Sequence, residues 1–190
     1  MAHATLTMRG TAPLLMHNTR LADPLDPIVR EMKPIMAKRS RKTDEDREAL
    51  ARLEYVGGLY FDPDVGPFVP GENVRQCLRG AAKRSRRGDK VQAGVLVPER
   101  VNPLGYTGPR DLDELWKDAN FRTVDSVVVE RKRIMRTRPM FRDWALSVEI
   151  EFDPEIIDRT ELEEFARLAG SIVGIGDWRP VYGRFAVEFE

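Results

Sequence analysis

Three segments of the chain alternate strictly between apolar and polar residues, and this period of two limits the folds that are open to it. The segments are 4–10, 145–152 and 184–190. The clearest of them, 145–152, has apolar residues at every second position: Leu146, Val148, Ile150 and Phe152. Such alternation predicts a β-strand with one buried face and one face in solvent. The rest of the chain must therefore cover one side of a sheet.

Two segments with helical spacing can provide this cover. The first, 71–84, repeats apolar or small residues at Val74, Cys77, Leu78, Ala81 and Ala82. The second follows a capping box at Thr160–Glu163 and continues the spacing with Phe165, Ala166 and Ala169. With a further strand expected at 91–98, the order becomes βαββαβ. We therefore predict an α+β, ferredoxin-like (RRM-like) domain with an antiparallel sheet and both helices on one face.

Two additions to this core are expected within a single domain spanning 1–190. A long insertion at about 17–65 follows the first strand and is rich in proline and charge, with short helices near 27–37 and 43–53. A β-hairpin with a long basic tip is expected from the β-prone run 124–135 paired with 145–152. The length suits one domain with a substantial core.

The charges of the chain cancel in number but are unevenly distributed. The 31 basic and 31 acidic residues give a formal net charge of zero, which by itself argues against nucleic acid. However, basic residues gather at 38–42, 83–87 and 131–142, whereas acidic residues gather at 149–164. A polarised surface of this kind suits an anionic polymer on one side, and it equally suits head-to-tail stacking of copies.

Several functional classes are disfavoured by composition. The only cysteine is Cys77 and there are two histidines, so neither an intramolecular disulfide nor a closed zinc site is expected. We predict no metal and no cofactor. Without an apolar run of about 20 residues or a secretory signal, no membrane partner is expected, and we expect a cytoplasmic protein.

Two groups of basic side chains are candidates for contacting a nucleic-acid backbone. Along the flank of helix 71–84 and just beyond it, the spacing of about four residues aligns Arg75, Arg79, Lys83 and Arg86. Near the expected hairpin tip stand Arg131, Arg133, Arg136 and Arg138. Beside this second group, Phe141 is a candidate for stacking on a base, whereas Trp144 is expected in the core.

Two motifs resemble those of the RAMP superfamily, the repeat-associated proteins of CRISPR effector complexes. The segment 69–79, Val-Pro-Gly-Glu-Asn-Val-Arg followed by Leu-Arg, is similar to the opening of that family's first helix. The segment 174–185 is similar to its glycine-rich loop between the second helix and the last strand. Its glycines are Gly174, Gly176 and Gly183, and Trp178, Arg179 and Arg184 are candidate RNA contacts.

The resemblance is closest to the backbone subunit, which polymerises along guide RNA and inserts a thumb-like hairpin between bases. It implies RNA or single-stranded DNA, further copies of the chain and other complex subunits as partners. The motifs also depart from the family, because Glu72-Asn73 replaces a serine pair and 177–180 contains few glycines. These departures favour a divergent phage or mobile-element member.

The resemblance also suggests low-ranking catalytic residues. In some backbone subunits an aspartate after the first strand cuts target RNA, and Asp23 and Asp26 lie in a comparable region. Processing nucleases of the superfamily often use a histidine, for which His17 is the candidate. The main hypothesis is a non-catalytic binding subunit that multimerises along RNA or single-stranded DNA. The alternatives are a RAMP-type endoribonuclease and a protein-only assembly subunit, such as a phage-type filament or ring.

Overall fold

The computed structural model describes residues 1–129 and 131–190 and divides them into two compact units. The first, here called the sheet unit, comprises 1–15, 61–107 and 142–190. The second, the helix–hairpin unit, comprises 16–60 and 108–141. The expected insertion therefore shares a unit with the later segment 108–141. Each unit is described by itself.

The sheet unit is built on a four-stranded antiparallel sheet. Its order is β10-β1-β9-β5. The strands are β1 (Ala2–Gly10), β5 (Val95–Leu96), β9 (Ala145–Phe152) and β10 (Phe185–Phe189). All three neighbouring pairs are antiparallel, with Leu6 opposite both Val148 and Phe189. The order places the fourth, first, third and second strands of a βαββαβ chain side by side. The predicted α+β, ferredoxin-like architecture is confirmed.

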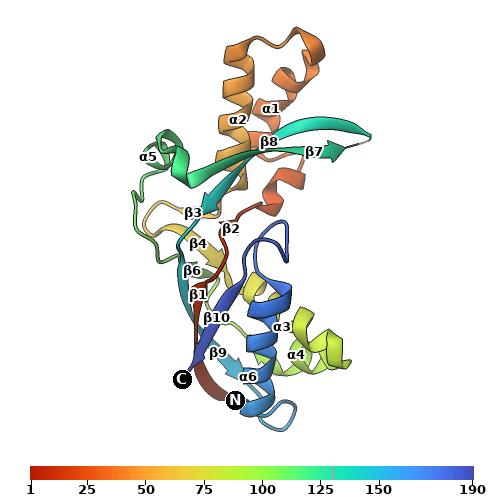
Figure 1. The fold of residues 1–190 in the computed structure, drawn as a ribbon, viewed down its shortest axis with the longest axis vertical. Coiled ribbons are helices and arrows are strands. Elements are labelled where there is room, and N and C mark those ends of the chain that lie inside the picture. Colours follow the sequence, from red (N-terminus) through yellow and green to blue (C-terminus); the bar gives the residue numbers. More distant parts are fainter. Residues whose placement is uncertain (130) are drawn as a thin grey trace. The chain divides into compact units, whose positions relative to one another are not determined.

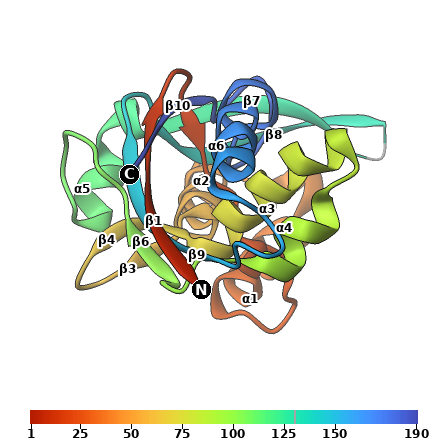
Figure 2. The ribbon, with the colours of Figure 1, turned by 90° about the horizontal axis from the view of Figure 1, so that it is seen from below.

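Two helices, α3 (Gly71–Ala82) and α6 (Arg159–Leu168), cover one face of this sheet (Figures 1 and 2). The inward residues of the central strands, among them Leu6, Met8 and Ile150, are fully buried. The helices meet them with the buried residues Val74, Cys77, Leu78, Ala81, Leu162, Phe165 and Ala166. Full burial of one such aliphatic side chain contributes about 1.5–3 kcal/mol. The two helix patterns are thus confirmed as the cover of the sheet.

The opposite face of the sheet is polar and carries acidic side chains. Thr5 donates a hydrogen bond from Oγ1 to Oε1 of Glu149 at 2.9 Å across β1 and β9. Glu151 and Glu188 lie on the same face, and Arg9 pairs with Glu188 at 3.4 Å. The outward positions of the four strands hold no phenylalanine, tyrosine or tryptophan. This face therefore lacks the stacking rings with which RRM sheets bind RNA.

The segment 91–98 differs from its prediction as a strand. Residues Gly88–Gly94 form helix α4, and only Val95–Leu96 continue as a strand. Val91 and Val95 are both fully buried and lie four positions apart, which suits a helical turn as well as an alternating strand. A short apolar run cannot distinguish the two by period alone.

A small three-stranded sheet leads into α3. Its order is β3-β4-β6, formed by β3 (Phe61–Asp62), β4 (Gly66–Pro70) and β6 (Val101–Pro103). Helix α3 begins directly after Pro70, and a Cβ atom on Gly71 would lie 2.4 Å from the carbonyl oxygen of Glu99. The Pro-Gly pair therefore lets the helix begin against a neighbouring backbone segment.

The helix–hairpin unit contains α1 (Pro27–Ala37), α2 (Asp44–Gly58) and α5 (Leu112–Lys117), with short 3-10 turns Thr19–Ala22, Arg39–Arg41 and Ala119–Phe121. Asp26 caps α1 by accepting a hydrogen bond from the Ile28 amide at 2.9 Å. Thr43 and Asp46 form a capping box at the start of α2. Helix α2 is longer than the expected 43–53 and takes in Gly57 and Gly58.

The hairpin of this unit consists of β7 (Arg122–Val129) and β8 (Lys132–Phe141), which extend together in Figure 1. The predicted pairing of 124–135 with 145–152 is wrong, because 145–152 is the central strand β9 of the other unit. The chain reverses next to Arg131, whose backbone is left-handed with φ of 66°. The β-prone run 124–135 spans this reversal and gives no signal of where it occurs.

A buried carboxylate joins α2 to the hairpin. Glu54 is only 6% exposed. It accepts hydrogen bonds from the Arg136 guanidinium and, at 2.9 Å, from the backbone amide of Thr137. Both partners lie on β8. The carboxylate therefore fixes the position of the helix along the strand, and its loss leaves buried donors without acceptors.

We expect Glu54→Ala to lower the free energy of unfolding by about 1–3 kcal/mol, because an orphaned buried donor costs that much. Denaturant unfolding followed by circular dichroism measures the change. The matched control is Glu48→Ala at an exposed position of the same helix, with an expected change within about 0.5 kcal/mol. Equal effects of the two substitutions would contradict the role given to Glu54.

Candidate nucleic-acid interface

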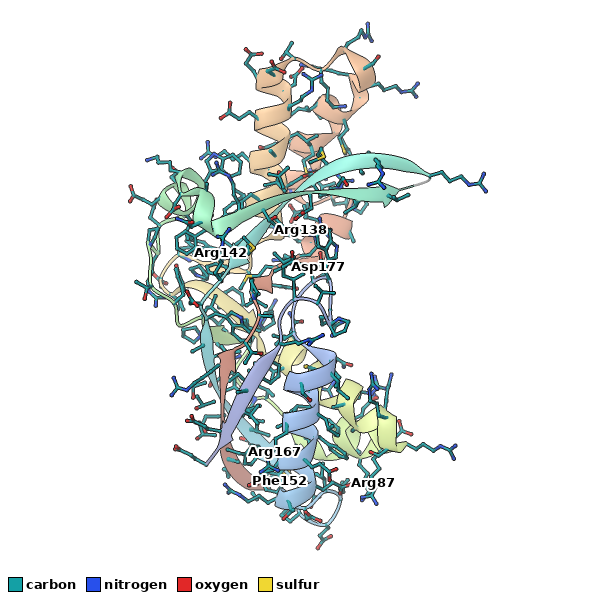
Figure 3. All side chains as sticks on the ribbon, in the orientation of Figure 1. Arg87, Arg138, Arg142, Phe152, Arg167 and Asp177 are labelled. Atoms are coloured by element: carbon teal, nitrogen blue, oxygen red, sulfur yellow. The ribbon has the colours of Figure 1, made fainter. Side chains whose placement is uncertain are left out.

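A groove in the sheet unit separates α3 from the glycine-rich loop that precedes β10. Its volume is about 650 Å³. On the helix side it is lined by Gln76, Gly80 and Arg84. On the other side it is lined by Ile172, Val173, Gly176, Asp177, Trp178, Arg179 and Pro180. We call this the loop–helix groove. Figure 3 shows Asp177 in the loop.

The three predicted loop glycines all have left-handed backbones. Their φ angles are 75° at Gly174, 87° at Gly176 and 70° at Gly183. At Gly183 a Cβ atom would lie 1.7 Å from the carbonyl oxygen of Ile175, so no other residue fits without rearrangement. The glycines therefore shape the loop.

The amides of this loop are largely used within the fold. The amide of Gly174 donates to Ala169 at 2.8 Å, and that of Ile175 donates to Gly183 at 2.9 Å. Asp177 and Gly183 donate to carbonyl groups of the segment after β1. These four donors are not available to a phosphate. Recognition by this loop therefore depends on its side chains.

Trp178 and Arg179 form the outer part of the loop. Trp178 has an unusual left-handed backbone, with φ of 51°, and its half-buried ring lies 6.0 Å from that of Tyr182. Arg179 is exposed and lines the groove. Arg184 is oriented differently, because its Nε donates to the carbonyl oxygen of Pro180 at 2.6 Å. The loop thus holds one partly exposed ring beside one exposed guanidinium group.

The helix side of the groove rests on a buried cysteine. Cys77 Sγ lies 3.1 Å from the carbonyl oxygen of Gly174, and burial raises the pKa of the thiol to about 12. Its environment is that of a small core residue, as the sequence suggested. Gly80 lets the chain approach closely, since a Cβ there would lie 3.2 Å from Val173 Cγ1.

Five cations surround the groove and the adjoining end of α3. We call them the basic cluster: Arg79, Lys83, Arg84, Arg86 and Arg179. None of them forms an ion pair within residues 1–129 and 131–190. Four are exposed, and the half-buried Arg79 has a buried Nε without a hydrogen-bond partner in the part of the chain described. Exposed cations without counter-ions attract anions.

The basic flank predicted along one helix is only partly realised. Arg75 is held by Glu72 through two hydrogen bonds of 2.8 and 2.9 Å. The guanidinium group of Arg75 and the amide of Gln76 lower the pKa of the Glu72 carboxyl. Helix α3 also ends at Ala82, so Lys83 lies in a 3-10 turn and Arg86 follows in a left-handed conformation. Arg75 is thus a structural partner, unlike the basic cluster.

The hairpin candidates have different environments. Arg131 is exposed, and Arg133 is exposed and donates to Ser126 at 3.3 Å. Arg136 is bound to the buried Glu54, and Arg138 is half-buried. A contact of Arg131 and Arg133 with nucleic acid stays a prediction.

The prediction for Phe141 requires correction. Its side chain is fully buried, with its ring 5.8 Å from that of Phe121, so a base cannot stack on it in this structure. Alternation at the end of a strand does not reveal which face a neighbouring 3-10 turn will cover. Trp144 lies in the core as expected, and its indole nitrogen donates to Ala12 at 2.9 Å.

The three catalytic candidates do not form a constellation. Asp23 accepts a hydrogen bond from the Leu25 amide at 2.8 Å, and Asp26 caps α1. The hydrogen bond from Arg20 lowers the pKa of the Asp26 carboxyl. His17 is exposed. Across 1–129 and 131–190 no three potential metal-ligating side chains gather, and no helix is long and apolar enough to cross a membrane.

Sequence reasoning missed three polar lining residues, Gln76, Arg84 and Asp177. Gln76 lies on α3 four positions before Gly80, and Arg84 lies four positions after it in the 3-10 turn Lys83–Ser85; Gly80 is the position where the loop approaches. Helical geometry would have identified them once that glycine was taken as the contact point. Asp177 is the one acidic side chain that lines the groove within the described residues.

Comparisons with known proteins gave matches among solved structures alone. No protein-family model and no curated protein matches the chain. Among solved structures it is similar to a chain of the type III-B Cmr-beta complex, determined by cryo-EM with cognate target RNA bound. The two are 9% identical with a TM-score of 0.49. The match covers 99% of this chain and 59% of that one, so this chain spans less than two thirds of its length.

We expect Gly183→Ala to distort the loop–helix groove, because a Cβ atom collides with Ile175. The buried Cys77 reports on this change, since it lies below the loop. Labelling with a thiol reagent should be slow in the native protein and faster in the variant. The control is Val181→Ala, at a loop side chain that is 70% exposed, where labelling should stay slow. Equal rates in both variants would mean that the loop does not cover the cysteine.

Proposed function

We propose that this chain binds single-stranded RNA or DNA through the loop–helix groove, as a non-catalytic subunit of a larger assembly. The observation that carries the proposal is the basic cluster, five cations that form no ion pair in the part of the chain that the structure describes, although the chain has equal numbers of acids and bases. Phosphates are the anions best suited to such a row of arginine and lysine side chains.

The groove favours a single strand over a duplex. A half-buried indole, Trp178, lies beside the exposed guanidinium of Arg179, and unpaired bases stack on aromatic and guanidinium planes. In a duplex the faces of the bases are already covered by their neighbours. The outer face of the sheet is acidic and would repel the same backbone, which directs the strand to the groove side.

Assembly along the strand is part of the proposal. The resemblance of the helix-opening and glycine-rich motifs to RAMP backbone subunits supports a chain that acts in several copies. Among the described residues the groove contains cations, a ring and a single carboxylate, Asp177, and no histidine, serine or cysteine lines it. In the helix–hairpin unit, the Asp23 carboxylate accepts a hydrogen bond from the Leu25 amide and Asp26 caps α1, which favours binding over cleavage.

Binding should be strongly dependent on salt. We expect the logarithm of affinity for a fluorescein-labelled oligonucleotide to fall linearly with the logarithm of salt concentration. The slope should be about −2 to −3.5, for three to five neutralised phosphates at about −0.7 each. Fluorescence anisotropy measures it for RNA and DNA of the same sequence. A slope near zero would contradict recognition through the backbone.

Reversing the groove charges should weaken this binding. We expect Arg84→Glu with Arg179→Glu to lower affinity at least roughly ten-fold and to make the salt slope shallower by about 1.4, since two phosphate contacts are lost. The matched control pairs Arg9→Glu with Arg167→Glu, which changes the net charge equally outside the groove. Equal losses in both variants would indicate a general charge effect and no defined site.

Trp178→Ala should lower affinity roughly ten-fold, because stacking of a base on an aromatic ring contributes about 1–3 kcal/mol. Trp178→Phe should recover most of the affinity, because it restores a ring. In both variants the salt slope should stay that of the unmodified protein. An alanine variant with unchanged affinity would exclude the indole as a stacking surface.

A further inference from the structure

Helix α1 of the helix–hairpin unit is only partly covered. Of its eleven residues, Met32 is the one that is buried. Its neighbour α2 packs against α1 and also against strand β8. The half-buried Ile28 and Ile35 of α1 lie seven positions apart, so they belong to one stripe along two turns of the helix. This stripe borders a cleft in place of a packed layer.

The cleft lies between α1, α2 and α5 and has a volume of about 770 Å³. On the α2 side it is lined by the half-buried Leu53 and Val56, which share a face of that helix at a spacing of three, and α5 contributes Leu112. Each of the two longer helices thus presents a short apolar stripe. Seven residues of helix rise roughly 10 Å, so the cleft is an apolar groove about two helical turns long.

Acidic side chains surround this groove. Glu31 lines it, and Glu45 and Glu48 line an adjoining hollow of about 290 Å³. All three are exposed, and none forms an ion pair within residues 1–129 and 131–190. Arg52 lines both cavities, but its guanidinium group is paired with Asp113, and this pair adds no net charge. The rim therefore carries an excess of negative charge.

Other cations of the same helices leave this excess in place. Arg47 forms an ion pair with Asp44 at 2.6 Å. Arg30 and Lys33 are set off from Glu31 by the helical period of 3.6 residues, which places them on other sides of α1. An acidic rim repels a nucleic-acid backbone and attracts a cationic partner.

A helix is the element that fits a groove between two helices. Rows of side chains on one helix pack into the grooves of its neighbours, and an amphipathic helix in an apolar groove is a recurring mode of protein recognition. A second copy of this chain fits poorly. The apolar faces of its α3 and α6 are buried against its own sheet, and two clefts placed face to face would bring like charges together.

We propose that the α1–α2–α5 cleft binds an amphipathic helix of a different protein, with basic residues on both sides of its apolar stripe. The apolar side chains of that helix cover Ile28, Ile35, Leu53 and Val56. Its lysine or arginine side chains approach Glu31 and the neighbouring glutamates. The bound helix completes the cover that α1 lacks. This interface goes beyond the proposed function and needs no nucleic acid.

A designed peptide tests the cleft. The probe has about 18 residues, which is long enough for a helix in water, with leucines in one stripe at spacings of three and four and lysine and alanine elsewhere. The control peptide has the same composition with its leucines spread around the helix. Fluorescence anisotropy should show that the probe binds at least roughly ten-fold more tightly than the control. Equal affinities overturn the proposal, because charge alone would then attract both peptides.

Substitutions in the groove identify the site. We expect Leu53→Asp and Ile35→Asp each to lower affinity for the probe at least roughly ten-fold, because each places a carboxylate in the apolar floor. The control is Val128→Asp, at a hairpin side chain that is 65% exposed, where affinity should stay that of the unmodified protein. Circular dichroism and thermal unfolding show which variants are folded. A folded groove variant that binds the probe normally overturns the proposal.

The rim glutamates determine which charge the partner carries. We expect Glu31→Gln with Glu48→Gln to weaken binding of the probe roughly three-fold and to make it less dependent on salt. The matched control, Glu155→Gln with Glu164→Gln, removes two exposed carboxylates from the sheet unit and should leave affinity unchanged. Equal losses in the two variants would refute recognition of a basic helix by this rim.

Cross-linking to the unmodified protein locates the bound helix directly. A benzophenone group in place of a central leucine of the probe attaches, on irradiation, to the residues that it contacts. Mass spectrometry should find the attachment within 27–37 and 44–58, and attachment mainly in other segments overturns the proposal. Light scattering tests the competing occupant. Self-association of the unmodified protein that is abolished by Leu53→Asp would assign the cleft to a second copy and overturn the proposal as well.

Discussion

The one-sided burial of the four-stranded sheet is the constraint on which the rest of the sheet unit depends. Leu6, Met8 and Ile150 point to one face and require α3 and α6 above them. Because the last strand, β10, pairs with β1 at the sheet edge, the chain must return from α6 along a short path. That path is the glycine-rich loop. The groove beside α3 is therefore a consequence of how the sheet is completed.

Much of this fold could be predicted from periodicity, because the strands and helices that face the sheet have only one apolar side. The segments 4–10, 145–152 and 184–190 were identified in this way, as were the helices expected at 71–84 and after 160. The structure places these helices at 71–82 and 159–168, and Asp158 caps the second in place of the expected Thr160. Prediction failed where a β-prone or apolar segment has no clear period that marks the boundaries of its elements. Segment 91–98 contains the end of a helix followed by a two-residue strand. Segment 124–135 contains parts of two paired strands and the reversal between them.

The candidate site was predictable in its glycines and less so in its charges. Gly174, Gly176 and Gly183 have left-handed backbones, a conformation that other residues rarely adopt, so the spacing of the glycines indicated the loop. Whether a basic side chain is available to bind an anion depends on which acidic side chains lie near it in the folded chain. Arg136 forms an ion pair with Glu54, which lies 82 positions away in the sequence. Rules based on the spacing of nearby residues do not identify such a partner. Burial of Phe141 by Phe121 is hidden from sequence for the same reason.

The acidic outer face of the sheet gives the sheet unit an uneven charge distribution that the zero formal net charge of the whole chain conceals. Glu149 and Glu188 lie on one side of the strands, whereas the basic cluster lies by the helices that cover the other side. The two kinds of charge are therefore partly separated within the unit. In the proposed binding, attraction of a polyanion to the basic cluster and its repulsion by Glu149 and Glu188 would orient the unit before contact. A chain without formal net charge would then meet the strand mainly in one orientation.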